Sequence, residues 1–527
     1  MTKKNDLDLK QQIGQMIVVR ASGHLFDHQI RYPRWEAPNA TLENWLKNLN
    51  LGGVILLGGS AAEISYRTQQ LQSWSPNPLL FCADIEEGAG QRFTGATFFG
   101  PPMSLGAIAK KSLTKATEYA YKMGAITAKE ALSMGINWIL APLADVNNNY
   151  NNPVINIRAF SDDPQIVGHL VRAFIAGAHS YPILTTAKHF PGHGDTSTDS
   201  HLELPIIKHD NDRLESLELP PFQEAIDQGV DAIMTAHLQI PAWDAHNPAT
   251  LSPAILTGQL RQKMGFDGLI VTDALIMGGV SKGATPEEIA VKAVIAGADI
   301  LLMPDDPIVA IESIYEAVKG GIITQSRIES SFTRIQRAKQ KLSPATGLNL
   351  WQEVGQLEAL ETVNSITIDA LESGGDLPVK GVSQGRNLIV VDDLLNSDFL
   401  DRTSPAVILP QQLGYELQLL DRTTLPLLTP QSLPTLLQVF IRGNPFRGSA
   451  GLTPQLQEVY KPLLESGYIK GIVVYGSPYI VDWFKVQVSS QLPWVFSYSQ
   501  THTAQRVALE SLFGTSPQSA IAFDVFV

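Results

Sequence analysis

The first 305 residues alternate between short apolar runs and longer stretches in which apolar residues recur with helical spacing. The short runs are rich in β-branched residues and predict eight strands, at 15–19, 53–57, 79–83, 136–141, 183–187, 231–236, 268–272 and 298–303. The longer stretches predict helices, including 113–134, 164–178, 213–228, 253–263 and 286–296. Strand followed by helix, repeated, is typical of βαβ units and a parallel sheet whose strands are apolar on both faces.

Polar residues at the ends of these runs favour one of two architectures. Eight strands in about 300 residues suit a TIM-like (β/α)8 barrel, but an open doubly wound sheet has a similar periodicity. Charged or imidazole side chains follow most of the runs, namely Arg20, Asp84, Asp145, Lys188, His189, His237 and Asp273. A barrel opens all its strand ends onto one face, whereas an open sheet concentrates its site at one switch point. The pattern therefore predicts a barrel.

The chain is expected to have two domains of different size. We assign residues 1–345 to a catalytic barrel that ends with a helix at 324–341, and residues 346–380 to a linker and connecting helix. The alternation of short apolar runs and stretches with helical spacing then begins again, which predicts a smaller C-terminal α/β domain of the sandwich type over 381–527. Its expected strands are 388–391, 406–409, 438–441, 471–475 and 494–498, with a helix at 454–466.

Composition excludes several classes of protein. Lys and Arg number 39 against 52 Asp and Glu, a net charge of −13, and no basic cluster is present, so a nucleic-acid partner is not expected. The single cysteine, Cys82, excludes an intrachain disulfide and a Cys-based zinc site. The sequence has no signal-peptide pattern, no apolar run long enough to span a membrane and no nucleotide-binding motif. We therefore expect a soluble, cytoplasmic protein without a cofactor. The sequence does not indicate its oligomeric state.

The most informative segment is the loop KHFPGHGDTSTDSH at 188–201, which holds three of the eleven histidines. Three interpretations compete. His189, His193 and His201 with a carboxylate can hold zinc, although the Pro-Gly pair between the first two removes the helix that makes their i, i+4 spacing useful. Asp199 and His201, at i and i+2 in an extended segment, can form an acid/base pair in which the carboxylate raises the pKa of the imidazole. The third interpretation is that the polar residues only tie a long loop to the barrel.

Four further residues are candidates, each with a structural alternative. Asp273 ends the seventh strand and is either a nucleophile or base, or a helix N-cap. Asp84 and Arg92 follow the third strand and form either part of a site or an exposed ion pair. Arg158 lies in the loop after the fourth strand, where a surface arginine is the alternative.

Taken together, five motifs resemble family-3 glycoside hydrolases of the β-N-acetylglucosaminidase type, in their two-domain bacterial form. They are the loop at 188–201, Asp84 with Arg92 eight residues on, NPVI-x-x-R-x-F with Arg158, MTAH with His237, and VTDAL with Asp273. The resemblance covers the first 345 residues, and only loosely the C-terminal domain. Two short segments depart from the family pattern: DIEEG after the third strand instead of DQEGG, and RAFS instead of RSFG. Neither removes a catalytic side chain.

The resemblance implies a retaining exo-β-N-acetylglucosaminidase that acts on cell-wall (muropeptide) or chitin fragments, without a metal. It implies that Asp273 is the nucleophile and that His201, paired with Asp199, is the general acid and then the general base. It also implies that the sugar is held by substrate-binding residues Asp84, Arg92, Arg158, Lys188 and His189.

Four alternatives remain open at this point. A β-glucosidase or β-xylosidase would usually lack the Asp-Ser-His loop, and a phosphorylase would gain from a neutral histidine that does not repel phosphate. A sugar-binding protein without activity would need no nucleophile. A metallohydrolase would lose its activity on exhaustive chelation.

Overall fold

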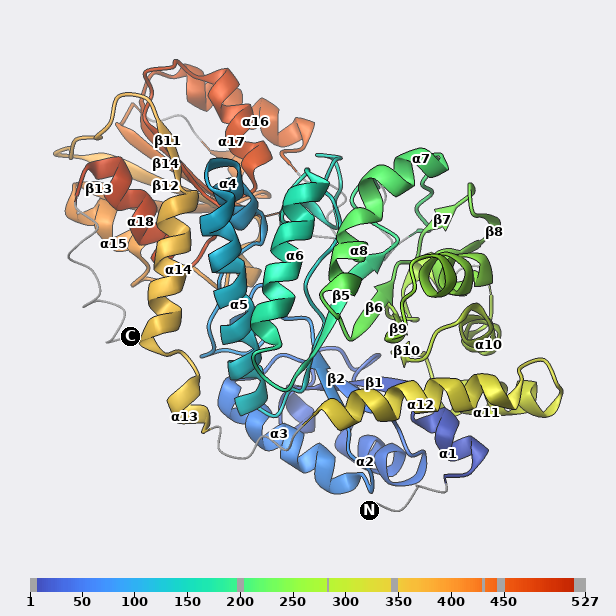
Figure 1. Cartoon of the computed structure of the whole chain (residues 1–527). Helices are drawn as coiled ribbons and strands as arrows, with labels where there is room; N and C mark the ends of the chain where they lie inside the picture. Colours follow the sequence, from blue (N-terminus) through green and yellow to red (C-terminus); the bar gives the residue numbers. More distant parts are fainter. Residues whose placement is uncertain are drawn as a thin grey trace. The chain divides into compact units, whose positions relative to one another are not determined.

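The computed structural model describes residues 7–196, 203–281, 284–342, 349–428, 432–442 and 451–515 (Figure 1). The chain forms two compact units. One comprises Met1–Phe99, Ala109–Asn149 and Arg158–Leu360, and the other Gly100–Ile108, Tyr150–Ile157 and Glu361–Val527. Two short segments from the first third of the chain therefore belong to the unit built mainly from its C-terminal part, and the domain boundaries at 345 and 380 stay a prediction.

The first unit contains an eight-stranded parallel sheet in the order β10-β1-β2-β3-β4-β5-β6-β9. A parallel bridge joins Val271 of β9 to Ile300, which directly precedes β10, so the sheet is nearly closed into the TIM-like barrel that the polar strand ends predicted. The strands are β1 Ile17–Ser22, β2 Gly53–Leu57, β3 Leu80–Ala83, β4 Trp138–Ile139, β5 Leu184–Phe190, β6 Ala232–Thr235, β9 Leu269–Thr272 and β10 Leu301–Leu302. Almost all of their residues are buried, as expected for strands covered on both faces.

Helices follow the strands, and α5, α6 and α8 lie side by side (Figure 1). The helices of this unit are α1 Leu9–Gly14, α2 Asn39–Asn48, α3 Ala61–Trp74, α5 Leu113–Ser133, α6 Pro164–Ala178, α7 Asn211–Arg213, α8 Pro220–Asp227, a helical segment Ala254–Lys263, α9 Gly278–Ser281, α10 Pro286–Ala296, α11 Pro307–Lys319, α12 Gln325–Lys341 and α13 Leu350–Glu353. A hairpin of β7 Gln239–Ile240 and β8 Asp244–Pro248 completes it. Within the described ranges, no helix combines the length and the apolar character that crossing a bilayer requires.

Local sequence signals explain where these helices begin. Thr285 caps α10, accepting from the backbone N–H of Glu288 while the Glu288 side chain accepts from the Thr285 N–H. Pro286 occupies the first helical position, where its missing N–H costs nothing. Asp163 caps α6 by accepting from the Gln165 backbone N–H, and Pro164 again lies in the first turn.

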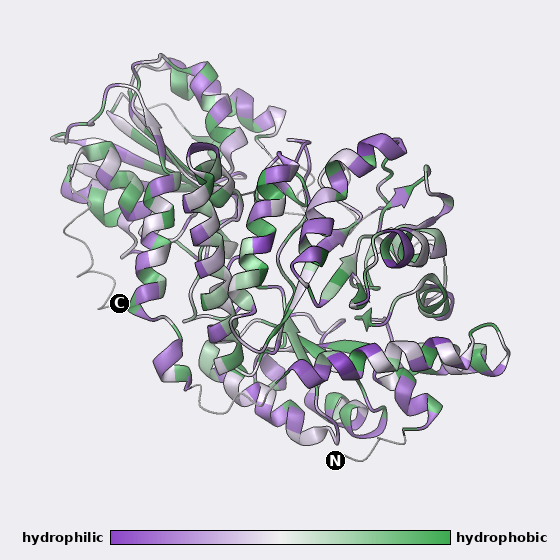
Figure 2. Cartoon of the chain, in the orientation of Figure 1, coloured by the Kyte–Doolittle hydropathy of each residue, from purple (hydrophilic) through white to green (hydrophobic). Residues whose placement is uncertain are grey.

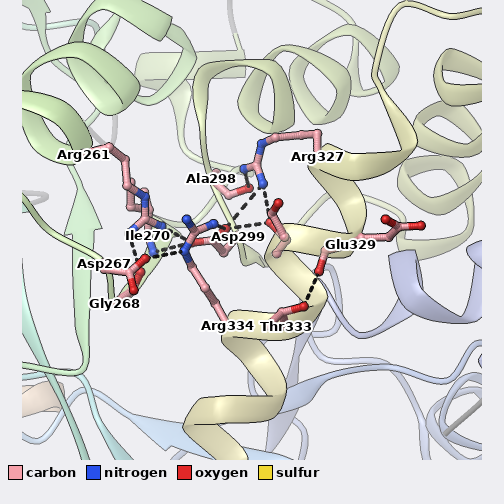
Figure 3. A network of polar contacts seen from close by, with 12 residues as sticks. Arg261, Asp267, Gly268, Ile270, Ala298, Asp299, Arg327, Glu329, Thr333 and Arg334 are labelled. Atoms are coloured by element: carbon pink, nitrogen blue, oxygen red, sulfur yellow. Dashed lines mark hydrogen bonds and ion pairs between the residues drawn. The ribbon is translucent and has the colours of Figure 1, made fainter. Parts of the chain in front are cut away.

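A buried carboxylate anchors α12 where β9 and β10 meet. Asp299 is fully buried just before β10 and accepts from the Ile270 N–H of β9 at 3.0 Å and from the Ser331 hydroxyl of α12 at 2.6 Å. The guanidinium groups of Arg261 and Arg327 also contact Asp299, and Figure 3 shows both arginines turned toward this carboxylate. These contacts join β9, the start of β10 and helix α12. They lie at the start of β10 and not at the carboxyl ends of the strands, where the polar candidate residues lie.

The second unit is a mixed six-stranded sheet in the order β11-β16-β15-β14-β12-β13, parallel except for β11. The strands are β11 Glu372–Gly374, β12 Gly385–Val391, β13 Tyr415–Asp421, β14 Thr435–Ile441, β15 Ile469–Gly476 and β16 Trp494–Ser497. Helices assigned at least in part to it are α4 Met103–Lys111, α14 Leu357–Ala370, α15 Pro405–Gln412, α16 Pro454–Glu465, α17 Pro478–Gln487 and α18 His502–Phe513. Its central strands are strongly apolar (Figure 2) and form the buried core, which confirms the predicted smaller α/β domain.

One predicted strand of this unit is wrong. The apolar run 406–409 lies inside helix α15, which has Pro405 at its first turn and buries Ala406 and Pro410, one turn apart. A run of four apolar residues fits a strand and a helix equally well. The strand at this place is instead β13, which the prediction missed because it is an edge strand whose side chains are mostly exposed or half-buried.

Candidate active site

Two carboxylates and two cations form a compact cluster at the carboxyl ends of β3 and β5. Asp84 directly follows β3, and its Oδ1 accepts from Nζ of Lys188, in β5, at 2.8 Å. The same Nζ lies 2.9 Å from Oε2 of Glu86. Arg158 approaches Glu86 with two nitrogens, its Nε at 2.6 Å from Oε1 and its Nη2 at 3.2 Å from Oε2. Residues up to 104 positions apart in the sequence are thus joined in one network.

Burial sets the charge state of this cluster. The side chains of Lys188 and Glu86 are only 1% and 2% exposed, and burial alone would raise the pKa of Glu86. Arg158 and Lys188 outweigh that effect and hold the pKa of Glu86 well below its ordinary value. For Lys188 the signs are reversed. Burial alone would lower its pKa, but the carboxylates of Asp84 and Glu86 together raise it above its usual range. All four groups are therefore charged at neutral pH.

Arg92 is tied to the same loop. Its Nε donates to the backbone carbonyl of Asp84 at 3.1 Å. Burial raises the pKa of the Asp84 carboxyl, whereas Lys188 and Arg92 lower it, and the net effect is a lowered pKa. Asp84 is 27% exposed, so this ionised carboxylate is accessible to a ligand.

A second buried carboxylate, Asp145, organises the start of the His-rich loop. It is fully buried after β4 and accepts from Nδ1 of His189 at 2.8 Å, and from the backbone N–H of His193 at 2.6 Å. Because Nδ1 of His189 contacts Asp145, Nε2 is the ring nitrogen that can contact a ligand. Burial lowers the pKa of His193 to about 4, so this imidazole is neutral at pH 7.

Asp273 directly follows β9, on the same end of the barrel. Its Oδ1 accepts from the backbone N–H of Ala274 at 2.7 Å, and its charge acts on the buried His193. His237, after β6, is fully buried, and its Nε2 donates to the Ala274 carbonyl at 3.0 Å while Nδ1 contacts the Thr250 hydroxyl at 2.8 Å. His237 therefore fixes the backbone that carries Asp273.

The remaining candidates, Asp199 and His201, lie outside the described residues. On either side of that segment, Asp195 and His209 form a hydrogen bond between the Asp195 carboxylate and Nε2 of His209. Arg213 extends this contact, with Nη2 3.8 Å from Asp195 and Nε 3.5 Å from Oε1 of Glu218. Side chains thus link Asp195 to His209 and Arg213, which lie on the other side of the segment that the structure does not describe.

The described residues contain no group of three or more His, Cys, Asp or Glu side chains arranged to hold a metal ion. His189 already donates Nδ1 to Asp145, and Cys82 is fully buried with a pKa that burial raises well above its ordinary value. The charged cluster around Lys188 offers hydrogen-bonding groups to a polar ligand. Asp84 offers carboxylate oxygens and His189 offers Nε2, while Lys188, only 1% exposed, holds Asp84 and Glu86 together.

Sequence reasoning missed two residues of this site. Glu86 was not selected, although its i, i+2 spacing from Asp84 in an extended segment places both side chains on one side. Asp145 follows a predicted strand, but the sequence does not indicate its partner, and only the folded chain shows that it holds His189. Arg20, expected after the first strand, lies within β1 and pairs with Glu36.

The barrel and its charged face define a family, which comparisons with known proteins identify. Residues 8–338 match the family model "Glycosyl hydrolase family 3 N terminal domain", and residues 379–514 match "Bacterial Glycosyl hydrolase family 3 C-terminal domain". The chain belongs to glycosyl hydrolase family 3.

Individual relatives carry more specific names. The chain is 35% identical to beta-hexosaminidase A of Pseudoalteromonas piscicida over 394 residues, which cover 67% of this chain and 64% of that protein. It is 28% identical to a beta-N-acetylglucosaminidase/beta-glucosidase of Cellulomonas fimi, with 58% and 55% of the two chains covered. The chain thus spans less than two thirds of these two curated relatives. A solved family 3 beta-N-acetylglucosaminidase from Paenibacillus sp. str. FPU-7 is 27% identical, with 97% of each chain covered and a TM-score of 0.78.

Proposed function

We propose that this protein is a retaining exo-β-N-acetylglucosaminidase that releases terminal β-linked N-acetylglucosamine. The observation that carries the proposal is the charged cluster around Lys188 at the end of the barrel where Asp84, His189 and Asp273 also lie. The names of the hexosaminidase relatives support the choice of sugar. Under this proposal the natural substrates are cell-wall or chitin fragments, and the process is peptidoglycan recycling. The single cysteine favours action in the reducing cytoplasm.

The proposed reaction has two steps. A carboxylate oxygen of Asp273 attacks the anomeric carbon, the glycosidic C–O bond breaks, and His201 donates its proton to the departing oxygen. Water then attacks the glycosyl-enzyme and gives its proton to His201, which releases the sugar and restores Asp273. Asp199 stabilises the imidazolium form of His201. The mechanism needs no cofactor.

The charged cluster around Lys188, with Arg92 and His189, is proposed to bind the sugar before the reaction. Asp84 and His189 accept hydrogen bonds from sugar hydroxyls, and Lys188, Arg92 and Arg158 donate hydrogen bonds or supply positive charge. Since Lys188 is held between two carboxylates, its ammonium group needs little reorganisation when the sugar arrives.

Two experiments test the proposal. The first compares turnover of nitrophenyl β-N-acetylglucosaminide, β-glucoside and β-xyloside, with and without phosphate. We expect the N-acetylglucosaminide to be preferred and free sugar to form without phosphate. Preference for another sugar indicates a β-glucosidase or β-xylosidase, sugar phosphate indicates a phosphorylase, and loss of activity on chelation indicates a metallohydrolase.

The second experiment identifies the nucleophile. A 5-fluoro glycoside inactivator should label Asp273, and Asp273→Ala should remove nearly all turnover without loss of folding. Labelling of another carboxylate, detected by peptide mass spectrometry, contradicts the assignment. An unlabelled, inactive wild type that still binds the sugar indicates a binding protein.

A further inference from the structure

The connection from β1 to α2, residues 23–38, exposes an unusual group of aromatic rings. The exposed fractions of Phe26, Tyr32 and Trp35 are 61%, 50% and 36%. The rings of Tyr32 and Trp35 are stacked, with centroids 5.9 Å apart and planes 23° apart. Neighbouring aromatic rings left in contact with water are typical of a binding surface.

A buried ion pair holds this aromatic pair in place. The Arg20 side chain, 9% exposed, donates from Nη2 and Nε to Oε1 of Glu36, which is 3% exposed, at 2.7 and 3.0 Å. The Arg20 guanidinium carbon lies 4.9 Å from the centre of the Tyr32 ring and 5.6 Å from that of Trp35. The backbone N–H of Tyr32 also donates to Glu36, at 3.4 Å. The rings are therefore ordered before any ligand binds, which reduces the entropy cost of binding.

Barrel topology and contacts between loops put the loop of the aromatic pair at the same end of the barrel as the candidate active site. Its loop leaves the carboxyl end of β1, the end of the barrel that carries Asp84. Nδ1 of His24, in this loop, lies 3.4 Å from Oε2 of Glu63, which follows β2. The connection after β2 in turn meets the loop after β3, where the Gly59 carbonyl accepts from the Thr94 N–H at 3.0 Å. The loop of the aromatic pair is thus linked in two steps to the loop of Asp84.

We propose that Tyr32 and Trp35 form a subsite for a sugar ring on the leaving-group side of the cleaved bond. This inference rests on the proposed glycosidase function and extends it to a saccharide leaving group. A pyranose presents an apolar face of C–H groups, and stacking on an aromatic face removes both surfaces from water. Because Glu36 neutralises Arg20, the charge of the guanidinium behind the rings is balanced, which favours a neutral sugar over an anionic lipid or nucleic acid.

The test compares two substrates that differ only in the leaving group. N,N′-diacetylchitobiose has a sugar leaving group, whereas β-N-acetylglucosaminyl azide has no ring there. We expect Trp35→Ala and Tyr32→Ala each to lower the ratio of kcat/KM for chitobiose to kcat/KM for azide about tenfold, mainly through KM. Trp35→Phe and Tyr32→Phe, which keep a ring, should restore most of that ratio.

A matched control is Tyr66→Ala, which removes a 67% exposed tyrosine from α3 and should leave both kcat/KM values unchanged. Equal losses on both substrates in folded Trp35→Ala, or no loss on chitobiose, overturn the subsite. A concentration-dependent dimer of the wild type that Trp35→Ala abolishes also overturns it, since the rings then contact a second copy.

A binding measurement separates this inference from the proposed function. Titration calorimetry of chitobiose against Asp273→Asn, with and without Trp35→Ala, requires no turnover. One outcome is that the wild type cleaves neither substrate, but adding Trp35→Ala to Asp273→Asn still weakens chitobiose binding about tenfold. In that case the glycosidase proposal fails while the saccharide site stands. If the wild type cleaves chitobiose and Trp35→Ala binds it unchanged, only the subsite fails.

Discussion

Replacing Glu86 by glutamine removes one negative charge from a buried cluster and keeps its shape. Glu86 contacts Arg158 through both oxygens and Lys188 through Oε2. Lys188 keeps its contact with Asp84 in the variant, whereas Arg158 loses the carboxylate that holds it. Removing one partner of a buried ion pair costs about 3–5 kcal/mol. Because the glutamine carbonyl still accepts one hydrogen bond, we expect the free energy of unfolding to fall by about 3 kcal/mol.

The effect should depend on pH in a defined direction. The pKa of Glu86 in the folded protein lies well below the ordinary value of 4.5. The stabilisation by ionised Glu86 is therefore fully present above pH 4.5 and is lost as the pH falls from there toward the folded-state pKa. The stability difference between wild type and Glu86→Gln should be constant near neutrality and should narrow below about pH 4.5.

The assay is thermal unfolding at a series of pH values, followed by circular dichroism. For a barrel of the size of residues 8–338, 3 kcal/mol corresponds to a fall of about 4 °C in Tm. Glu43→Gln is the matched control, since Glu43 is 39% exposed and pairs with Lys47 one helical turn away; its effect should stay below about 1 °C. Equal shifts in the two variants, or a difference that does not narrow in acid, would refute the reasoning.

Three further predictions concern other polar groups. In Asp145→Asn, the N–H groups of His189 lose a charged acceptor, and we expect urea titration to show a loss of about 1–3 kcal/mol in unfolding free energy together with lower kcat/KM. Burial lowers the pKa of Lys339 to about 7 from 10.5, so the folded protein binds fewer protons between these values; wild type should gain stability relative to Lys339→Met from pH 7 to 10, and parallel curves would contradict this. Asp195→Asn replaces the charged partner of His209 by a neutral amide and so weakens the contact between these two residues. If that contact positions the proposed acid His201, kcat should fall more for a disaccharide than for a nitrophenyl glycoside, and equal losses would show that it does not.

Much of the barrel could be predicted from the sequence because its signals are local. Continuous apolar strands alternate with helices that carry their own caps, and the predicted helix 286–296 coincides with α10 because Thr285, Pro286 and Gly297 mark both of its ends. The motifs with Asp84, Lys188 and Asp273 likewise lie at strand ends. In a parallel barrel the carboxyl ends of all strands lie on one face, so these residues are expected on that face. Such features depend on neighbours within a few residues, and these are visible in the chain itself.

Pairings between distant parts of the chain were decided only by the tertiary structure. Glu86 meets Arg158 across 72 positions, and Asp145 meets His189 across 44, because closing the barrel brings successive strand ends together. The run 406–409 lies in a helix that buries Ala406 and Pro410, one turn apart, and its four apolar residues alone fit a strand equally well. The sequence by itself therefore determined the order of the strands and helices of the barrel and put charged residues at its strand ends. Tertiary structure decided which of those groups share a proton or a charge, since burial and partners from distant strands set their pKa values.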